Sequence, residues 1–371
     1  MIDPRITTLA KNLVHYSVAA KAGDKVLIEA HETDTPLITE LIKELYHVGA
    51  LPFAELFDAK VSRALLNGLT EEHAKTWARY SVARMSEMDC YIGVRGGKNS
   101  FETSDVAQDK KELYAKFYTH PVHHNERVLK SRWVVLRYPN ESMSQQAGMS
   151  TERFEEFYFN VCNLDYSKMD RAMDALKNLL DNTDRVRITA KDTDISFSIK
   201  GIGSKKCSGH MNIPDGEVYS APVKDSVNGV ISYNTPSIHQ GVKFENVSLT
   251  FENGKIVKAS ANHAEKLNQI LDTDEGARYV GEFAIGVNPY ITRPMGDILF
   301  DEKITGSVHF TPGACYDDAF NGNNSAVHWD LVLMQTPEYG GGELWFDGVL
   351  VRKDGRFVAK ELEGLNPENL K

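Results

Sequence analysis

The chain has 371 residues, of which 42% are hydrophobic and 25% are charged, and its formal net charge is -10. This length is typical of about two domains, and the acidic character argues against a nucleic-acid partner, because proteins that bind nucleic acids usually carry a basic surface. The sequence contains no apolar run of about 18 residues, and its start, MIDPRITTLAKNLV, lacks the layout of a signal peptide. We therefore expect a cytoplasmic protein that does not enter a membrane.

The first half of the sequence alternates helical and strand-like segments. Apolar residues recur at helical spacing between Ile6 and Tyr16 and between Ile38 and Val48. Short continuous apolar runs, typical of strands buried on both faces, occupy residues 25–30, 90–94 and 132–138. Two more helices are expected at residues 151–162 and 166–181. This alternation predicts an α/β layer with a mainly parallel sheet, but the turn HETDTP lacks the glycines of a dinucleotide-binding motif.

From Asp184 onward the apolar residues follow a period of two, which is typical of antiparallel strands. Three Asn-Gly or Asp-Gly pairs, which favour tight hairpin turns, start at Asn253, Asp347 and Asp354. One helix is expected at residues 263–271. We therefore predict an α/β N-terminal domain, residues 1–183, and an α+β, β-rich C-terminal domain, residues 184–371.

Acidic and imidazole side chains lie among apolar residues in four segments of the second half. These segments hold Glu217 in IPDGEVYSAP, Glu282 in YVGEFAIGVNP, Glu302 and His309 in LFDEKITGSVHFTPGACY, and His328 and Asp330 in SAVHWDLV. The last segment is expected to be a strand, so His328 and Asp330 would point to one face and Trp329 into the core. An ionised carboxylate buried among apolar residues costs several kcal/mol without a partner. Because only Lys224 and Lys303 are basic nearby in the sequence, a metal ion is the expected partner.

Carboxylates and imidazoles without thiolates suit Zn²⁺, Co²⁺ or Mn²⁺. Five or six such ligands exceed the three protein ligands of a single catalytic zinc, and this favours a pair of ions. The four cysteines follow no C-x-x-C spacing and are expected to be reduced. Each of these residues, taken alone, could instead have a purely structural role. It could be a core histidine, part of a His–Asp hydrogen bond within a sheet, or a turn carboxylate. The three histidines of THPVHHNER, residues 119–127, indicate a solvated loop or helix start rather than a metal site.

Four segments together resemble the thermophilic aminopeptidase family, peptidase family M29. They are P-x-G-E-V-x-x-A-P at 214–222, GEFAIGVNP at 281–289, DEKITGSVH at 301–309 and NSAVHWD at 324–330. The resemblance implies a homodimeric cytoplasmic exopeptidase with two divalent ions, commonly zinc or cobalt, in a cavity between its domains. The residues that match ligand positions are Glu217, Glu282, His309, His328 and Asp330, with Glu302 as a further ligand, and Tyr316 matches an active-site tyrosine.

The expected reaction is hydrolysis of the N-terminal peptide bond of a peptide with a free N-terminus, by a water that two ions activate. Glu282 or Asp330 would bridge the ions, and the general base would be Glu217, Glu282 or Glu302. Tyr316 would donate a hydrogen bond to the oxyanion or orient the amine. Two alternatives stay open: another metallohydrolase, such as an amidase or dipeptidase, and a non-catalytic metal-stabilised protein that binds peptides.

Overall fold

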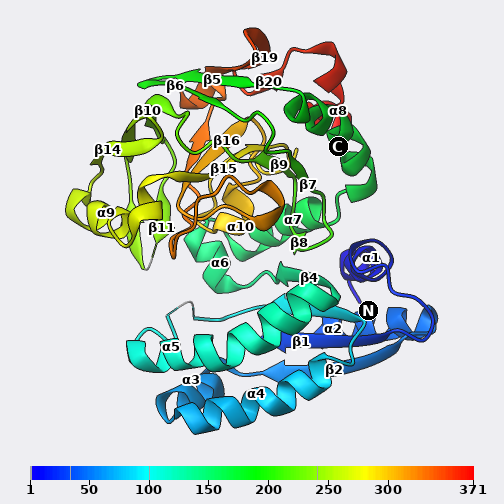
Figure 1. The fold of residues 1–371 in the computed structure, drawn as a ribbon. Coiled ribbons are helices and arrows are strands. Elements are labelled where there is room, and N and C mark those ends of the chain that lie inside the picture. Colours follow the sequence, from blue (N-terminus) through cyan, green and yellow to red (C-terminus); the bar gives the residue numbers. More distant parts are fainter. Residues whose placement is uncertain (1, 34, 100, 240) are drawn as a thin grey trace. The chain divides into compact units, whose positions relative to one another are not determined.

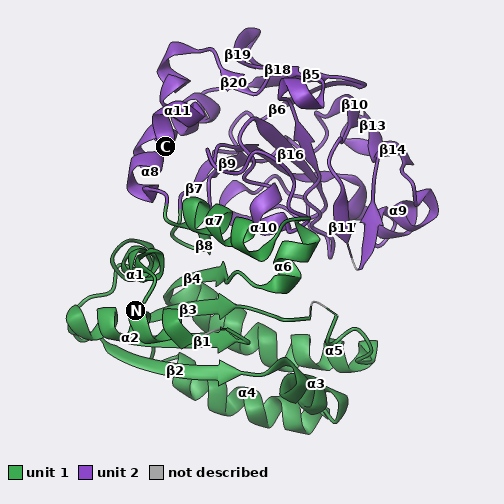
Figure 2. Ribbon diagram, turned by 180° about the vertical axis from the view of Figure 1, so that it is seen from behind, with its two compact units in different colours: residues 1–163, 209–213 green, residues 164–208, 214–371 purple. Residues whose placement is uncertain are grey.

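The chain divides into two compact units, each of which is described by itself (Figure 2). Unit 1 comprises residues 1–163 and 209–213, and unit 2 comprises residues 164–208 and 214–371. The computed structural model describes residues 2–33, 35–99, 101–239 and 241–371.

The helix α8 (Tyr166–Asp181) belongs to unit 2, whereas the predicted boundary at residue 183 assigns it to the first domain. The helix is fastened to unit 2 by polar contacts, since the Lys206 Nζ donates to Asp174 Oδ1 over 2.6 Å and the Ser208 hydroxyl donates to Asp170 Oδ1 over 2.7 Å. These contacts join residues far apart in the sequence, and the helical periodicity does not reveal them.

Unit 1 is built on the predicted parallel sheet, with strand order β2-β1-β3-β4-β8 (Figure 1). The strands are β1 (Lys25–His31), β2 (Leu51–Phe57), β3 (Cys90–Arg95), β4 (Arg132–Arg137) and β8 (Asn212–Ile213). The helices are α1 (Pro4–Lys11), α2 (Thr35–His47), α3 (Ala59–Asn67), α4 (Glu71–Met85), α5 (Gln108–Tyr114), α6 (Glu141–Gln146) and α7 (Thr151–Cys162). Two π-helical segments are η1 (Asn12–Ser17) and η2 (Ala115–Val128). The periodicity therefore located α1, α2, α7 and three strands correctly.

The histidine-rich segment 119–127 lies within η2 and is helical rather than a loop. Val122 of this segment and Tyr118 of η2 are buried in one hydrophobic cluster with Tyr91 of β3 and Met85 of α4. The ring of His123 makes edge contacts with the rings of Tyr91 and Tyr118. Packing against the sheet therefore keeps this polar sequence helical.

Burial among these rings, together with Arg127, lowers the pKa of His123 to about 3. The unfolded chain takes up this proton near pH 6.5, so the unfolded state gains stability relative to the folded state as the pH falls below that value. We expect His123→Asn to reduce the loss of unfolding free energy between pH 7 and pH 5 by about 2 kcal/mol. Denaturant unfolding of the metal-free protein at the two pH values measures this. The exposed neighbour His124 provides the control; equal pH dependence in His123→Asn and His124→Asn would contradict the assignment.

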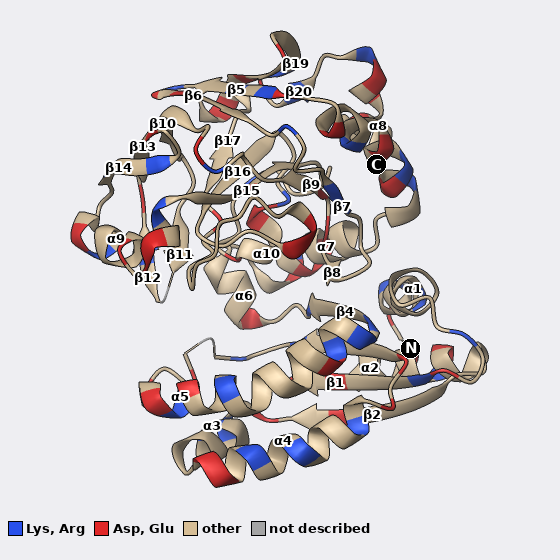
Figure 3. Ribbon diagram, viewed as in Figure 1, with Lys and Arg blue, Asp and Glu red and all other residues tan. Residues whose placement is uncertain are grey.

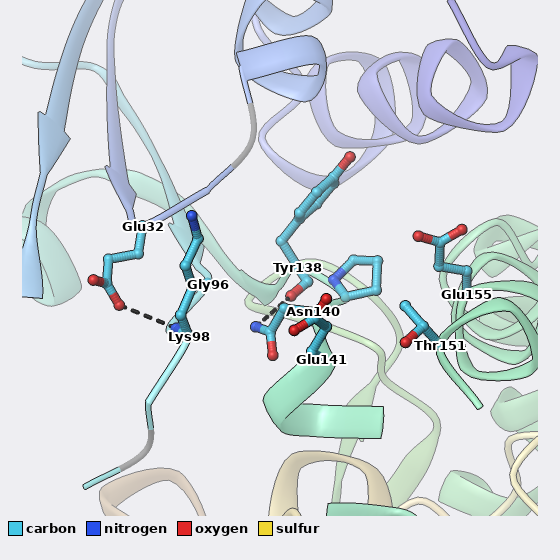
Figure 4. Close-up of a pocket in the computed structure, with 9 residues that line it drawn as sticks. Glu32, Gly96, Lys98, Tyr138, Asn140, Glu141, Thr151 and Glu155 are labelled. Atoms are coloured by element: carbon cyan, nitrogen blue, oxygen red, sulfur yellow. Dashed lines mark hydrogen bonds between the residues drawn. The ribbon is translucent and has the colours of Figure 1, made fainter. Parts of the chain in front are cut away.

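A cavity of about 330 Å³ lies where three parallel strands of unit 1 end (Figure 4). Glu32, Gly96 and Tyr138, which directly follow β1, β3 and β4, line it together with Thr151 and Glu155 of α7. Open α/β sheets commonly bind ligands at this edge. The groups of metal-binding side chains found among the described residues, however, all lie in unit 2.

Unit 2 contains an eight-stranded antiparallel sheet, a five-stranded antiparallel sheet and a hairpin (Figure 1). The large sheet has the order β14-β13-β10-β6-β5-β18-β19-β20. Its strands are β5 (Arg185–Ala190), β6 (Thr193–Ser198), β10 (Asn228–Ser232), β13 (Ser248–Glu252), β14 (Lys255–Ser260), β18 (Gly342–Phe346), β19 (Val349–Lys353) and β20 (Arg356–Phe357). The three predicted tight turns join its strands, and Asn253, Asp347 and Asp354 each have a positive φ, as such turns require.

The smaller sheet has the order β17-β16-β15-β9-β7. Its strands are β7 (Lys205–Cys207), β9 (Glu217–Ser220), β15 (Val280–Gly286), β16 (Ser307–Pro312) and β17 (Val332–Met334), and the hairpin is β11 (Ser237–His239) with β12 (Val242–Phe244). The remaining helices are α9 (Ala264–Leu271), α10 (Ile298–Asp301) and α11 (Pro367–Leu370), with short 3-10 segments η3 (Glu275–Arg278), η4 (Asp317–Ala319), η5 (Pro337–Tyr339) and η6 (Lys360–Leu365). The prediction of a β-rich second half is confirmed.

The eight-stranded sheet and the smaller, five-stranded sheet of unit 2 pack against each other through aromatic side chains. Phe197 of β6 packs edge-on against Phe283 of β15, with ring centroids 5.0 Å apart, and Phe251 of β13 packs against Phe310 of β16. Side chains alternate across a strand, so this core fixes which residues of β15 and β16 face away from it. Within the described part of the chain, no helix has the length and apolar character to cross a bilayer.

Candidate metal centre

Three of the predicted ligands lie on the face of the smaller sheet that is opposite the aromatic core. Glu217 is paired with Gly286, His309 with Ala284 and Thr311 with Glu282 across neighbouring antiparallel strands. Residues paired in this way point to the same face, which therefore carries Glu217, Glu282 and His309 together. Their neighbours Phe283 and Phe310 point into the core. Figure 3 shows acidic residues around α10 and the adjoining strands.

Glu282 lies between two imidazoles and contacts one with each carboxylate oxygen. Its Oε1 is 3.2 Å from His309 Nε2, and its Oε2 is 3.3 Å from His328 Nε2. His328 Nε2 is also 3.2 Å from Asp330 Oδ1, and Glu217 Oε2 is 3.5 Å from His309 Nε2. These side chains form two groups whose ligand atoms lie within 4.8 Å of one another: Glu217–Glu282–His309 and Glu282–His328–Asp330. Glu282 is common to both groups.

The second group is held in place by hydrogen bonds to the ends of β16 and its extension. His328 Nδ1 lies 2.8 Å from the carbonyl oxygen of Ala314, a hydrogen bond that leaves Nε2 facing the carboxylates. The Thr311 hydroxyl donates to Asp330 Oδ1 over 2.8 Å. Such outer hydrogen bonds fix the orientation of metal ligands.

The predicted strand over residues 325–332 is wrong in its extent. Only Val332 of this range belongs to β17, and His328 forms an isolated bridge with Gly313. The regular ladder stops because Pro312 has no amide hydrogen and Gly313 has a φ of 109°, where an added Cβ would lie 2.0 Å from the Val327 carbonyl oxygen.

The side chains of this extended segment nevertheless alternate as expected. His328 and Asp330 lie side by side, while Trp329 is 3% exposed and its ring stacks on His239. The Trp329 Nε1 donates to the Ser237 hydroxyl over 2.9 Å. The buried tryptophan therefore anchors the backbone that presents the two ligands.

The centre carries more negative charge than its own cations neutralise. Burial opposes ionisation of Glu282 and Asp330, but the two histidines outweigh it and lower the pKa of both carboxyls. Burial also opposes protonation of the imidazoles, yet the carboxylates raise the pKa of His309 to about 9 and that of His328 to about 11. A centre that draws protons onto a buried and a partly buried imidazole has the charge imbalance that a divalent cation relieves.

Two buried atoms also fit a metal ion. Glu217 Oε2 and His328 Nε2 make no well-aligned hydrogen bond within the described ranges, although each lies 3.2–3.5 Å from an oppositely charged group of the centre. Both point into the ligand groups, where a cation would satisfy them. The oxygen and nitrogen donors are those that zinc, cobalt or manganese accept.

Lys303 is a cationic partner that the sequence analysis did not place in the centre. Its Nζ is 2.9 Å from Glu217 Oε1 and 3.9 Å from Asp215 Oδ1, and it contacts Glu302 Oε1 closely. Burial opposes its charge, but Glu217, Glu302 and Asp215 raise the pKa of Lys303 well above its usual range. The expectation that metal ions alone meet these carboxylates is therefore incomplete.

Asp215 and Cys207 are further residues that sequence reasoning missed. With Glu217 they form a third group whose ligand atoms lie within 4.8 Å of one another. Asp215 follows the same logic of a buried carboxylate in an apolar segment, whereas Cys207 has no spacing signal. Glu302, predicted as a ligand, is absent from the three groups that the described residues form. Burial raises the pKa of Glu302 to about 8, although Lys303 opposes this.

Tyr316 stands at the edge of the centre, directly before η4. Its ring centroid is 5.0 Å from that of His328 and 5.3 Å from that of Tyr219. Burial of the hydroxyl and the charges of Glu282 and Asp330 raise the pKa of Tyr316, so the hydroxyl keeps its proton as a donor. The residue as a whole is 47% exposed, so part of the ring stays accessible to a bound molecule although the hydroxyl lies near the buried carboxylates.

Comparisons with known proteins agree with the resemblance in the sequence. The chain is 38% identical over 160 residues to aminopeptidase AmpS of Bacillus subtilis, a match that covers 38% of each chain. It is 33% identical over 164 residues to aminopeptidase T of Thermus thermophilus, covering 40% of this chain and 38% of that relative. The matched segments thus span less than two fifths of these relatives. Aminopeptidase PepS of Streptococcus thermophilus matches over 92% of this chain and 93% of its own at 23% identity.

Two solved structures share the fold over nearly the whole chain. AmpT of Thermus thermophilus has a TM-score of 0.76 at 20% identity and covers 97% of this chain and 100% of its own. A 2,5-dihydroxypyridine dioxygenase from Pseudomonas putida has a TM-score of 0.61 at 13% identity, over 96% of this chain and 98% of its own. The fold alone therefore does not determine the reaction. The model of the thermophilic metalloprotease (M29) family, however, matches residues 2–357, and the chain therefore belongs to that family.

Proposed function

We propose that the protein is a metal-dependent aminopeptidase that removes the N-terminal residue of peptides. The observation that carries the proposal is Glu282, whose two oxygens face two different imidazoles and which belongs to two ligand groups. A shared carboxylate is the arrangement by which two adjacent ions are held in a hydrolase. The names of the relatives AmpS, aminopeptidase T and PepS support peptides as the substrate class.

We assign Glu217, Glu282 and His309 to one ion and Glu282, His328 and Asp330 to the other. Two ions held there would anchor the amino group, polarise the scissile carbonyl and lower the pKa of a bound water to about 7. Tyr316 donates its hydroxyl hydrogen to the carbonyl oxygen as negative charge develops on it. Thr311 keeps Asp330, and the Ala314 carbonyl keeps His328, in the orientation that binding requires.

We further propose zinc or cobalt as the native ion, with manganese as another acceptable metal, and a cytoplasmic homodimer. The four free cysteines support a reducing compartment. The edge strand β2 exposes Leu51, Phe53 and Leu56, and an apolar edge of this kind is normally covered by a partner. Sedimentation analysis of the metal-loaded protein tests the dimer; a single monomeric species at micromolar concentration would contradict it.

The activity is tested with leucine p-nitroanilide and its N-acetylated form after chelation and after addition of Co²⁺ or Zn²⁺. We expect release of nitroaniline only from the free-amine substrate and only with metal, because one ion anchors the amino group. Cleavage of the blocked substrate would favour another metallohydrolase. Metal-dependent peptide binding without cleavage of a peptide series would favour the non-catalytic binding protein.

A further inference from the structure

We propose that the ammonium group of Lys303 occupies a third cation position beside the two-ion centre. There it leaves Glu217 a single oxygen for a metal ion and keeps Glu302 out of the ligand groups. This inference rests on the proposed two-ion function, and it concerns how many ions the centre accepts and which carboxylates reach them.

The geometry around Lys303 is that of a bound cation. The side chain is 1% exposed and its Nζ lies beside Asp215, Glu217 and Glu302. The ammonium donates hydrogen bonds to Glu217 and Glu302, and Asp215 Oδ1 lies 3.9 Å away as a further ionic partner. The backbone is fixed as well, because the Lys303 amide donates to the Phe300 carbonyl over 3.1 Å and the Lys303 carbonyl accepts from the Asn288 amide over 3.0 Å. The ammonium is therefore held at a defined point.

The two carboxylate oxygens of Glu217 face different cationic positions, one of which is the ammonium group of Lys303. Glu217 Oε1 accepts from Lys303 Nζ over 2.9 Å, whereas Oε2 is buried, lies 3.5 Å from His309 Nε2 and has no hydrogen-bond partner in the described chain. Only Oε2 is therefore free to meet an ion. Because Oε1 is directed toward the Lys303 ammonium, Glu217 presents Oε2 to the ion.

Charge balance gives an independent reason for the third cation. Five carboxylates meet in this region: Asp215, Glu217, Glu282, Glu302 and Asp330. When all five are ionised, one ammonium and two divalent ions match their charge, and buried charge of either sign is costly when it is left uncompensated. Without the ammonium, the same carboxylates would be left with excess negative charge and would favour another cation.

Lys303 also lies beside three side chains that could bind a metal ion if its ammonium group were removed. Cys207, Asp215 and Glu217 have ligand atoms within 4.8 Å of one another, and Lys303 Nζ contacts two of these residues. A thiol and two carboxylates can serve as ligands for zinc. In the wild-type protein the ammonium occupies the approach to this group.

The test is metal stoichiometry, measured by mass spectrometry of the metal content and by calorimetric titration of the chelated protein with Zn²⁺. We expect two equivalents for the wild type and a third for Lys303→Met, which keeps most of the unbranched side chain and removes its charged end. Cys207→Ser combined with Lys303→Met should return the count to two. Lys224→Met, at a lysine that lies over the Tyr279 ring, is the matched control and should keep two equivalents.

Two equivalents with unchanged Kd in Lys303→Met, or loss of an ion, would overturn the third-cation position. If Lys303→Met fails to fold, Glu302→Gln provides the test. Because Glu302 lies outside the ligand groups, this variant should still bind two zinc equivalents, with a Kd within about threefold of the wild-type value. Loss of an equivalent in Glu302→Gln would show that Glu302 is a ligand and would overturn the proposal. Failure of the wild type itself to bind two ions would instead contradict the proposed function.

Discussion

Replacement of Glu282 by Gln is expected to remove both ions and nearly all activity. Glu282 gives one oxygen to each ligand group, and a carboxamide offers one neutral oxygen in place of a charged bridge. Each group would be left with two ligands, fewer than the three that catalytic zinc sites normally have. Ions contribute several kcal/mol to stabilising the transition state of hydrolysis, so kcat/KM should fall by about 10³-fold or more.

Metal content and kcat/KM are measured together on the same Glu282→Gln preparation. Glu252→Gln makes the same chemical change at an exposed residue of β13 and should keep both ions and full activity. A Glu282→Gln protein that retained two equivalents and wild-type kcat/KM would refute the shared ligand. One retained equivalent would show that a single group suffices to bind an ion and that Glu282 does not bridge.

The proposed ligands that lie close together could be picked out from the sequence because their signal is local. His328 and Asp330 are two residues apart in an extended segment, and Glu282 is a carboxylate within a continuous apolar run, so each stands out without knowledge of the fold. The turns at Asn253, Asp347 and Asp354 could be predicted for the same reason, since their chemistry fits a two-residue loop.

The features that the sequence could not reveal depend on contacts between distant residues. Lys303 and Glu217 are 86 positions apart, and the periodicity of neither segment specifies the distance between their side chains. The strand β8 is two residues long and joins the first sheet from a segment beyond α8. The sequence pattern does not predict the strand β2, because its apolar residues are largely exposed at the sheet edge and do not form a continuous buried run.

Proteins that carry out different reactions share this architecture. A dioxygenase and a member of the aminopeptidases have this architecture at low sequence identity. The arrangement of the sheets therefore does not determine the reaction, which depends on the side chains that the sheets carry. In this chain the proposed ligands Glu217, Glu282 and His309 lie on one face of the smaller sheet, where β9, β15 and β16 bring them together. Substitutions that alter the reaction without altering the metal content should lie at the rim of that face.

Tyr316 is at this rim, and Tyr316→Phe is expected to lower kcat/KM by about 10²- to 10³-fold, the loss typical of removing one oxyanion donor. The metal content should stay at the wild-type value, because Tyr316 belongs to none of the ligand groups that the described residues form. The phenylalanine keeps the ring contacts with His328 and Tyr219, so a change in kcat/KM reports the hydroxyl rather than packing. Tyr80→Phe, at an exposed tyrosine of α4, is the control and should retain full activity. Full kcat/KM in Tyr316→Phe would remove the hydroxyl from the mechanism, whereas a loss of rate with both ions bound separates donation by Tyr316 from metal binding by Glu282.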